Sequence, residues 1–439
     1  MPDASSPERI GVPAIAWSIY DFGYSLFAYV LFARYLGDWI INDLGHPDFY
    51  YTSAQAIAAL MLFVLMPIAG VIADLQGRHK PLLIGFTLLA SGTGALVGLM
   101  NPDIGVFGVF PVIALATISA TATGLTFGQF DPMLAAVAPR RNWSLMSGVA
   151  VAAGYVGIVL WLTVLARHIV GNGGSDIQRA FGPASGIMLV FALPLFLFVR
   201  EHAHGDAEVR EQARRIGVAR LAGKRLRGTF GRLRAQPGVV RFLLGRLMYA
   251  DAVGTVQIYA IVYMSRVGSF GEREKNLASL MVVGAGVVGA LGAGWLARRI
   301  GPRRTLLAIV PLFAVGLGIV AGAGTPWAVW VLAPIVGIAL GTIYTVDRVF
   351  MLALTPPESR GEMFGFFNLI GRAGQALGPF VLWGGVIYLL HDLTGWLSAL
   401  DASRVSLGLL AISAVVGLLV IRPLDDGSHV AVGPVHRCP

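Results

Sequence analysis

Two aspartates lie inside strongly apolar stretches of the chain, Asp21 near the start and Asp251 shortly after the midpoint. A charged side chain in hydrocarbon costs several kcal/mol, so one that is retained usually faces water, a partner or a substrate. The pattern favours a proton or cation site, or recognition of an amine. The structural alternatives are a helix-capping carboxylate for Asp21 and an Asp–Arg pair for Asp251.

Trp17, Asp21 and Tyr24 recur at helical spacing, so a carboxylate and two aromatic rings share one face of the first apolar stretch. Aromatic rings beside a carboxylate suit a cationic ligand. In the stretch around Asp251, Arg246 lies on another face, and Gln257 returns to the face of Arg246. We expect Trp17, Asp21, Tyr24, Asp251 and Gln257 to belong to a substrate or coupling site.

A third polar stripe consists of Asn368, Arg372 and Gln375, at positions i, i+4 and i+7 of another apolar stretch. A guanidinium can hold a carboxylate or phosphate through two parallel hydrogen bonds. Arg372 is therefore a candidate substrate ligand, and equally a candidate counter-ion for one of the buried aspartates.

A short turn recurs in the two halves of the chain. Residues 70–80 read G-V-I-A-D-L-Q-G-R-H-K, and residues 294–304 read G-W-L-A-R-R-I-G-P-R-R. Each copy joins two apolar stretches through a glycine and a basic cluster. The repeat predicts a duplicated unit, with both copies in the same sense about an axis normal to the membrane.

The first copy of this turn is a candidate gate. Gly70 would permit close helix contact, Asp74 would meet the positive N-terminus of another helix, and Gly77 forms the turn. Arg78 is expected to pair with Asp131. The alternative, membrane orientation by positive charge, accounts for Arg78 but not for Asp74 or Gly77.

Asp347 and Arg348 end another apolar stretch and are expected to form a second interfacial charge pair that contributes to gating. Simple anchoring at the membrane interface is the alternative.

The eight histidines fall in loops, tails or the ends of apolar stretches, and the single cysteine is Cys438. This distribution predicts no metal site and no cofactor, and without a phosphate-binding glycine loop ATP is not the expected energy source.

The elements that position these residues follow from composition. The chain of 439 residues is 56% hydrophobic and 13% charged, against about a quarter charged in soluble proteins. Apolar runs of about 20 residues are long enough to cross a bilayer as helices. We therefore predict an all-α membrane protein with spans at 14–36, 54–74, 81–100, 106–130, 144–166, 181–199, 240–264, 278–297, 305–323, 327–347, 362–389 and 404–421.

The basic residues predict the orientation. Of 33 Lys and Arg, 23 fall on the side of the two termini and 6 on the other, so both termini are expected to be cytoplasmic. The first outer loop, with Asp38, Asp43 and Asp48, has no basic residue. The expected domains are a six-helix bundle at 1–199, a cytoplasmic linker at 200–239 and a second six-helix bundle at 240–439 that ends in a short disordered tail.

The linker mixes both charges and then becomes basic, so the net charge of +9 does not indicate nucleic acid. Its apolar residues are spaced loosely like one helix face. A surface helix on anionic lipid and a solvated linker remain equally good interpretations.

Twelve spans, the six-plus-six repeat and the G-x-x-x-D-x-x-G-R-x-K turn together resemble the major facilitator superfamily. Several strings resemble its vacuole effluxer-like (UMF) family: W-S-I-Y-D-F-G-Y-S at 17–25, D-L-Q-G-R-H-K-P-L-L at 74–83, G-V-A-V-A-A-G-Y-V-G at 148–157, R-F-L-L-G-R-L-M-Y-A-D at 241–251 and F-G-F-F-N-L-I-G-R-A-G at 364–374. The resemblance implies two bundles that rock about a mid-membrane site, and export of amino acids from a storage vacuole as the family's known activity.

The favoured function is a secondary transporter, not an enzyme, in a bacterial-type inner membrane. It would move a small polar solute such as an amino acid, by proton-coupled or facilitative export, with protons or Na⁺ and membrane lipid as partners. One alternative is a sugar transporter like the glycoside–cation symporters. Another is a non-transporting sensor or lipid-handling protein on the same fold.

Overall fold

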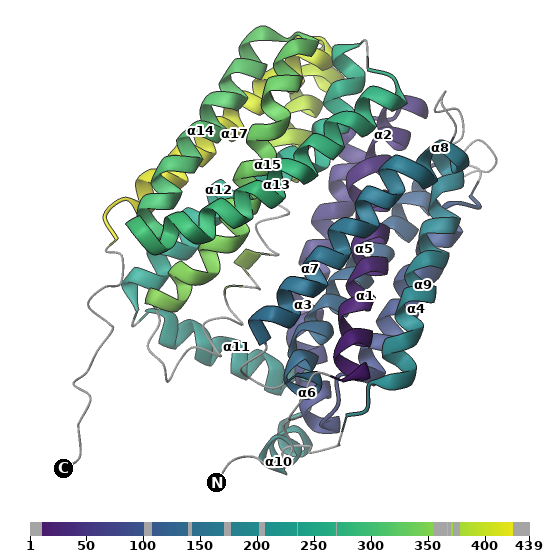
Figure 1. Cartoon of the computed structure of the whole chain (residues 1–439), viewed down its shortest axis with the longest axis vertical. Helices are drawn as coiled ribbons and strands as arrows, with labels where there is room; N and C mark the ends of the chain where they lie inside the picture. Colours follow the sequence, from purple (N-terminus) through teal and green to yellow (C-terminus); the bar gives the residue numbers. More distant parts are fainter. Residues whose placement is uncertain are drawn as a thin grey trace. The chain divides into compact units, whose positions relative to one another are not determined.

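The computed structural model describes residues 11–100, 108–138, 143–170, 177–201, 207–234, 236–268, 270–354, 367, 370–371 and 378–424, and these residues form helices and turns without strands (Figure 1). Eleven helices within these ranges are long and apolar enough to cross a membrane. They correspond to eleven of the twelve predicted spans. The remaining span, 362–389, lies partly outside the described residues, and its described part contributes the shorter apolar helix Gly378–Leu393.

The contacts divide the chain into two units, which are described separately. The first unit comprises Met1–Leu226 and Phe270–Leu277. Its helices are α1 (Val12–Ala28), η1 (Tyr29–Tyr35), α2 (Leu36–Asp38), η2 (Trp39–Asp43), α3 (Asp48–Gln76), α4 (Lys80–Val97), α5 (Phe110–Phe130), η3 (Asp131–Met133), α6 (Leu134–Val137), α7 (Trp143–Leu160), η5 (Trp161–Leu165), α8 (Ala166–Ile169), η6 (Ile177–Ala180), α9 (Phe181–Phe198) and α10 (Ala207–Ile216). The helix α11 (Val218–Arg234) begins in this unit and ends in the second.

The second unit comprises Arg227–Ser269 and Ala278–Pro439. Its helices are α12 (Pro237–Val267), most of α13 (Glu272–Ile300), α14 (Pro302–Ala323), α15 (Pro326–Leu354), η8 (Gly378–Gly385), η9 (Tyr388–Leu393) and α17 (Ala399–Ile421). The first turn of α13, up to Leu277, groups with the first unit although the rest of the helix groups with the second.

The first span is longer than predicted, and two acidic residues move with it. The prediction ended this helix at residue 36 and placed Asp38 and Asp43 in an outer loop. The structure continues the helix through Asp43, and Asp38 is buried. Asp48 is the first residue of α3 rather than part of the loop. The extension is possible because Asp38 has a buried cationic partner, described below.

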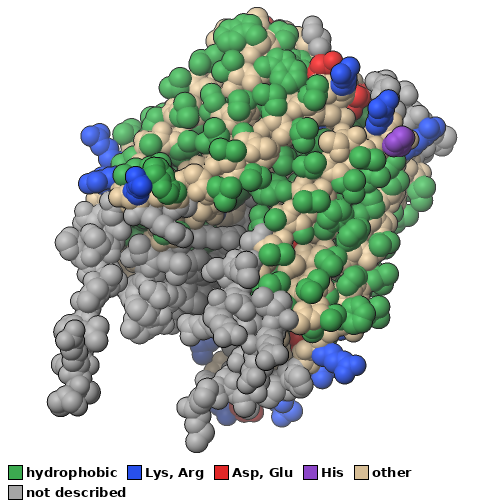
Figure 2. All heavy atoms as spheres, viewed as in Figure 1, with side chains coloured by type: hydrophobic (Ala, Val, Ile, Leu, Met, Phe, Trp, Pro, Cys, Tyr) green, Lys and Arg blue, Asp and Glu red, His purple; other side chains and the backbone are tan. Residues whose placement is uncertain are grey.

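The sides of the spanning helices are apolar. On the face shown in Figure 2, hydrophobic side chains cover the flanks of the helices, while Lys and Arg gather near their ends. Exposed side chains at mid-helix include Leu60, Val190, Leu291 and Ile412. Apolar side chains of this kind can face the hydrocarbon of a bilayer. The helical backbone can also lie there, because its hydrogen bonds are made within each helix. The chain is an integral, multi-pass membrane protein.

The turn between α3 and α4 is held by Glu201, which lies just after the end of α9. Gly77 ends α3 in the left-handed conformation, with φ of 64°. The backbone N–H groups of His79 and Lys80 both donate to the Glu201 carboxylate, at 2.8 and 2.7 Å. A carboxylate at this position satisfies the open N–H groups at the start of α4 and complements its dipole. The sequence motif predicted the turn at Gly77, but it did not predict that Glu201 would bind the start of α4.

Candidate functional site

Asp21 lies in the interior of α1, against the glycine face of α7. It is 6% exposed, and its Oδ1 accepts a hydrogen bond from Ser25 Oγ at 3.4 Å. A Cβ added at Gly154 would lie 3.1 Å from Asp21 Oδ2. Gly154 therefore admits the carboxylate between the two helices. Among the described residues, no Lys or Arg forms an ion pair with Asp21.

The aromatic neighbours predicted for Asp21 are held by α5 instead. Trp17 stacks on Phe130 at 4.4 Å between ring centroids and donates its Nε1–H to the Phe130 carbonyl at 3.1 Å. Tyr24 donates to the Thr123 carbonyl at 3.3 Å. The stripe of Trp17, Asp21 and Tyr24 exists, but its rings are buried in packing. It does not form an open aromatic cage around the carboxylate.

Asp251 occupies a comparable position in the second unit. It is 6% exposed, and the Gly378 backbone hydrogen-bonds its carboxyl group. A Cβ at Gly378 would lie 2.6 Å from Asp251 Oδ2 and would overlap the Thr255 hydroxyl. The other oxygen, Oδ1, has no hydrogen-bond partner among the described residues. A buried carboxylate oxygen without a partner is rare in native structures and calls for a proton, an ion or a ligand.

The two aspartates share one local design. Each is followed four residues later by a hydroxyl residue, Ser25 or Thr255, and each packs on a glycine that leaves room for its carboxylate. The likeness between the surroundings of Asp21 and Asp251 is what the predicted repeat leads one to expect. Gln257, in contrast, is exposed on α12. Asn368, Arg372 and Gln375 lie outside the described residues, so the third polar stripe stays a prediction.

Asp347 does not end its helix as predicted, and its ion-pair partner comes from α12. It lies within α15, which continues to Leu354, and it is 1% exposed. Arg246 Nε donates to its Oδ2 and Tyr249 Oη to its Oδ1, both at 2.7 Å. The Arg246 guanidinium also lies 3.9 Å from the centroid of Phe367. The pairing partner of Asp347 is thus Arg246, and the Arg348 side chain lies outside the described residues.

The structure shows some, but not all, of the contacts predicted for the candidate gate at residues 70–80. Gly77 forms the turn as expected, and Asp74 is half-buried in the last helical turn of α3. A Cβ at Gly70 would meet nothing within 4 Å among the described residues, so these residues do not supply the expected close contact. Arg78 is exposed, and Asp131 opens the short η3 turn. Their mutual pairing stays a prediction.

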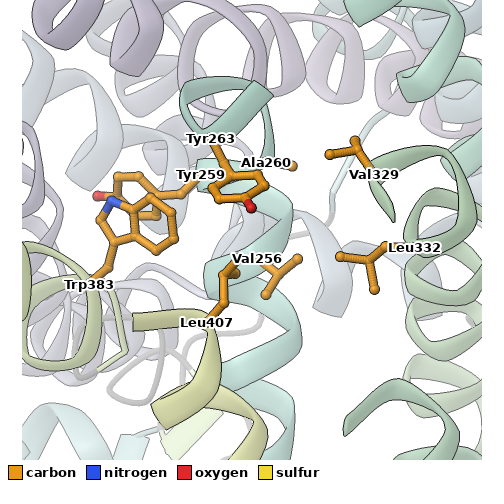
Figure 3. Close-up of a pocket in the computed structure, with 8 residues that line it drawn as sticks. All are labelled: Val256, Tyr259, Ala260, Tyr263, Val329, Leu332, Trp383 and Leu407. Carbon is orange, nitrogen blue, oxygen red and sulfur yellow. The ribbon is translucent and has the colours of Figure 1, made fainter. Parts of the chain in front are cut away.

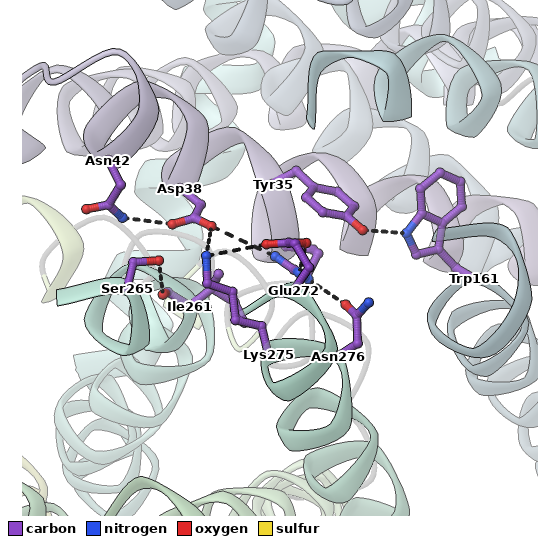
Figure 4. Close-up of polar contacts among 10 residues, drawn as sticks. Tyr35, Asp38, Asn42, Trp161, Ile261, Ser265, Glu272, Lys275 and Asn276 are labelled. Carbon is purple, nitrogen blue, oxygen red and sulfur yellow. Dashed lines mark hydrogen bonds and ion pairs between the residues drawn. The ribbon is translucent and has the colours of Figure 1, made fainter. Parts of the chain in front are cut away.

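A buried charge network inside the first unit was not predicted from the sequence (Figure 4). Arg34 Nη2 contacts Glu272 Oε2 at 2.5 Å, and Lys275 Nζ contacts Asp38 Oδ2 at 2.6 Å. Lys275 also lies 3.4 Å from Glu272, and Asn276 accepts from Arg34 Nε at 3.0 Å. All four charged residues are at most 8% exposed. The only local signal was the i, i+4 spacing of Arg34 and Asp38.

We predict that replacing Lys275 with Met destabilises the protein. The substitution removes the close cation of Asp38 and leaves Arg34 at 4.0 Å, so the network carries net negative charge. Removal of one member of a buried ion pair costs about 3 kcal/mol. Thermal melting of the purified protein measures the loss. The control is Arg273→Met, an exposed neighbour on the same helical turn, which should leave the melting temperature close to wild type. Equal melting of both variants and wild type would contradict the prediction.

One internal cavity of the second unit is apolar and small (Figure 3). It has a volume of about 30 Å³, and it lies beside Tyr259, which stacks on Trp383 at 5.0 Å between centroids. Its other lining residues are Val256, Ala260, Tyr263, Val329, Leu332 and Leu407. The volume accommodates about one water molecule. This cavity is therefore not a binding site for a metabolite.

Known proteins similar to this chain include a bacterial transporter and a group of fungal proteins. A 23% identical relative, "Uncharacterized MFS-type transporter YxiO" of Bacillus subtilis, aligns over 84% of this chain and 86% of its own length. "Autophagy-related protein 22" of Yarrowia lipolytica is 28% identical over 56% of this chain and 46% of that protein, so the chain spans less than half of that relative.

Solved structures share the fold. The nucleoside transporter NupG (D323A mutant) superposes with a TM-score of 0.72 at 13% identity, covering 94% of this chain and 99% of that one. A bacterial homologue of the human lysosomal transporter Spinster gives a TM-score of 0.66 at 14% identity, with 94% and 97% coverage. The family model described as Major Facilitator Superfamily matches residues 14–379. With its helical spans and two compact units, the chain belongs to the major facilitator superfamily of membrane transporters.

Proposed function

We propose that this transporter moves a small polar solute, such as an amino acid, by alternating access, and that proton movement through Asp21 and Asp251 drives it. The observation that carries the proposal is the pair of buried carboxylates without ion-pair partners among the described residues, each in a membrane-spanning helix. A carboxyl group so placed can be neutralised by a proton, and its charge state then couples to the position of a solute.

An amino acid is the favoured solute class for two reasons. The motifs around Asp21 and in the first turn resemble the vacuole effluxer-like family, and the similarity to Autophagy-related protein 22 supports that resemblance. A carboxylate is also a suitable partner for the ammonium group of an amino acid. Export across a bacterial-type inner membrane, with both termini cytoplasmic, fits the distribution of Lys and Arg.

A proton is favoured over Na⁺ by the packing of the two sites. Gly154 and Gly378 bring helix backbone close to Asp21 and Asp251, which leaves little space beside each carboxylate. A sodium ion needs several oxygen ligands around it, whereas a proton needs no added volume. A sugar–cation symporter is the second function that the sequence suggests. Sugar flux stimulated by sodium would distinguish it from a proton-coupled amino-acid transporter.

The test is flux in sealed proteoliposomes that contain the purified full-length chain. We expect a panel of labelled amino acids to include at least one that accumulates when a proton gradient is imposed, and a protonophore to abolish that accumulation. Protein-free vesicles are the control. If correctly folded protein moves neither amino acids nor sugars under proton or sodium gradients, the transport proposal fails in favour of a sensing or lipid-handling role.

A further inference from the structure

The positive charge of the chain is concentrated in the two helices that follow α9. Residues 207–234, which form α10 and α11, contain nine Lys and Arg but only two Glu. Their net charge of +7 compares with +9 for the whole chain. Such a concentration requires an explanation, because the other loops carry only a few basic residues each.

The apolar face of this helix pair is already occupied. Val209 of α10 and Leu221 and Ala222 of α11 are at most 3% exposed, and they form a buried cluster with Val71 of α3. Ile68 and Leu75 of α3 pack at the edge of the same cluster. These apolar residues are therefore not available for insertion into a bilayer, which is how a free amphipathic helix binds lipid.

The opposite faces of the two helices present charge. The exposed basic side chains are Arg210, Arg214, Arg215, Arg220 and Lys224. Arg215 pairs with Glu211 at 2.7 Å, and Arg210 Nε donates to the Leu75 carbonyl at 3.3 Å. Arg210 and Arg214 are four residues apart on α10, as Arg220 and Lys224 are on α11, so each pair lies on one helical face.

Packing on α3 also sets the depth of these helices relative to the bilayer. The contacts involve Val71 and Leu75, close to the end of the spanning helix at Gln76. Figure 1 shows α10 beyond the end of the long helices of the first unit. The basic faces thus lie near the level where α3 leaves the hydrocarbon, which is the level of phospholipid headgroups.

We propose that Arg210, Arg214, Arg220 and Lys224 form a binding surface for anionic phospholipid headgroups. The surface binds by charge alone, since its apolar side is closed by α3. This inference does not depend on the transported solute. It implies that binding weakens with salt and discriminates by headgroup charge rather than by acyl-chain packing.

The experiment titrates phosphatidylglycerol into the purified full-length chain in a neutral detergent and follows the melting temperature. A lipid that binds the native state raises this temperature. We expect phosphatidylglycerol to raise it at about 50 mM salt and the shift to shrink at about 300 mM salt. Phosphatidylcholine should have little effect. Glycerol phosphate at the same concentration separates a free phosphate from a membrane headgroup and should also have little effect.

The variant Arg220→Gln/Lys224→Gln tests the residues. Each basic residue near anionic lipid contributes about fivefold to the lipid affinity. Loss of two such residues should therefore raise the lipid concentration that gives half of the melting-temperature shift about 25-fold. The matched control is Arg167→Gln/Arg273→Gln, which removes two exposed basic residues predicted to lie on the other membrane side. It should respond to lipid as the wild type does. Equal loss in both variants, or equal shifts with both phospholipids, would overturn the proposal.

Discussion

Asp251→Asn should reduce gradient-driven transport to the level of protein-free vesicles while the protein remains folded in the membrane. Asparagine has nearly the shape of aspartate and can keep the hydrogen bond with the Gly378 backbone. It cannot, however, carry a charge or release a proton. Because Oδ1 of Asp251 lacks a partner among the described residues, the packing does not depend on the charge that is lost.

Two flux measurements separate the possible roles of this carboxylate. Solute exchange across vesicles at equal pH needs substrate binding but no net proton movement. If Asp251 carries the coupling proton, Asp251→Asn retains exchange and loses accumulation. If Asp251 contacts the solute, both are lost. Unchanged accumulation by the variant would remove Asp251 from the mechanism.

Asp21→Asn provides the parallel measurement in the first unit, with Ser25→Ala as its control. Ser25 donates to Asp21 at 3.4 Å, a long contact that contributes little, so its removal should leave most of the flux. Asp21→Asn should resemble Asp251→Asn if the two comparable sites work together. Full activity in both neutral variants would contradict the coupling proposal.

Much of the fold could be predicted because its signals are local. Apolar length identified the spans, and a glycine between apolar stretches identified the turn that ends α3 at Gly77. The burial of Asp21 and Asp251 could also be predicted, since a single acidic residue in a long apolar run has no exposed face to occupy. The ends of the helices were harder to predict, because acidic residues near the end of an apolar stretch are typical of a loop.

Asp38 shows why that reading failed. Asp38 is buried in the extended helix beside Lys275, which is 237 residues away in the sequence. Arg246 and Asp347 are 101 residues apart and present the same difficulty. Hydropathy and helical period describe one segment at a time, so they cannot identify a charge partner on another helix. The stripe at Trp17 shows a different limit. Its helical spacing was predicted, but spacing does not reveal that Phe130 stacks on the Trp17 ring.

Arg246→Met should destabilise the protein by about 3–5 kcal/mol, because the change leaves a buried carboxylate without its cation. Among the described residues, Asp347 would keep the hydrogen bond from Tyr249 and lose its cation. The matched control is Arg241→Met, an exposed arginine of the same helix that donates to the Val420 carbonyl. We expect a large fall in the melting temperature for Arg246→Met and a small one for Arg241→Met.

The double variant Arg246→Met/Asp347→Asn identifies the cause of the loss. Its neutral amide can still accept from Tyr249, and no buried charge is left unpaired, so more than half of the lost stability should return. A structural ion pair that stabilises only the second unit would also leave exchange flux in the double variant largely intact. If the double variant melts no higher than Arg246→Met, the loss comes from missing guanidinium contacts, such as that with Phe367, rather than from the stranded charge on Asp347.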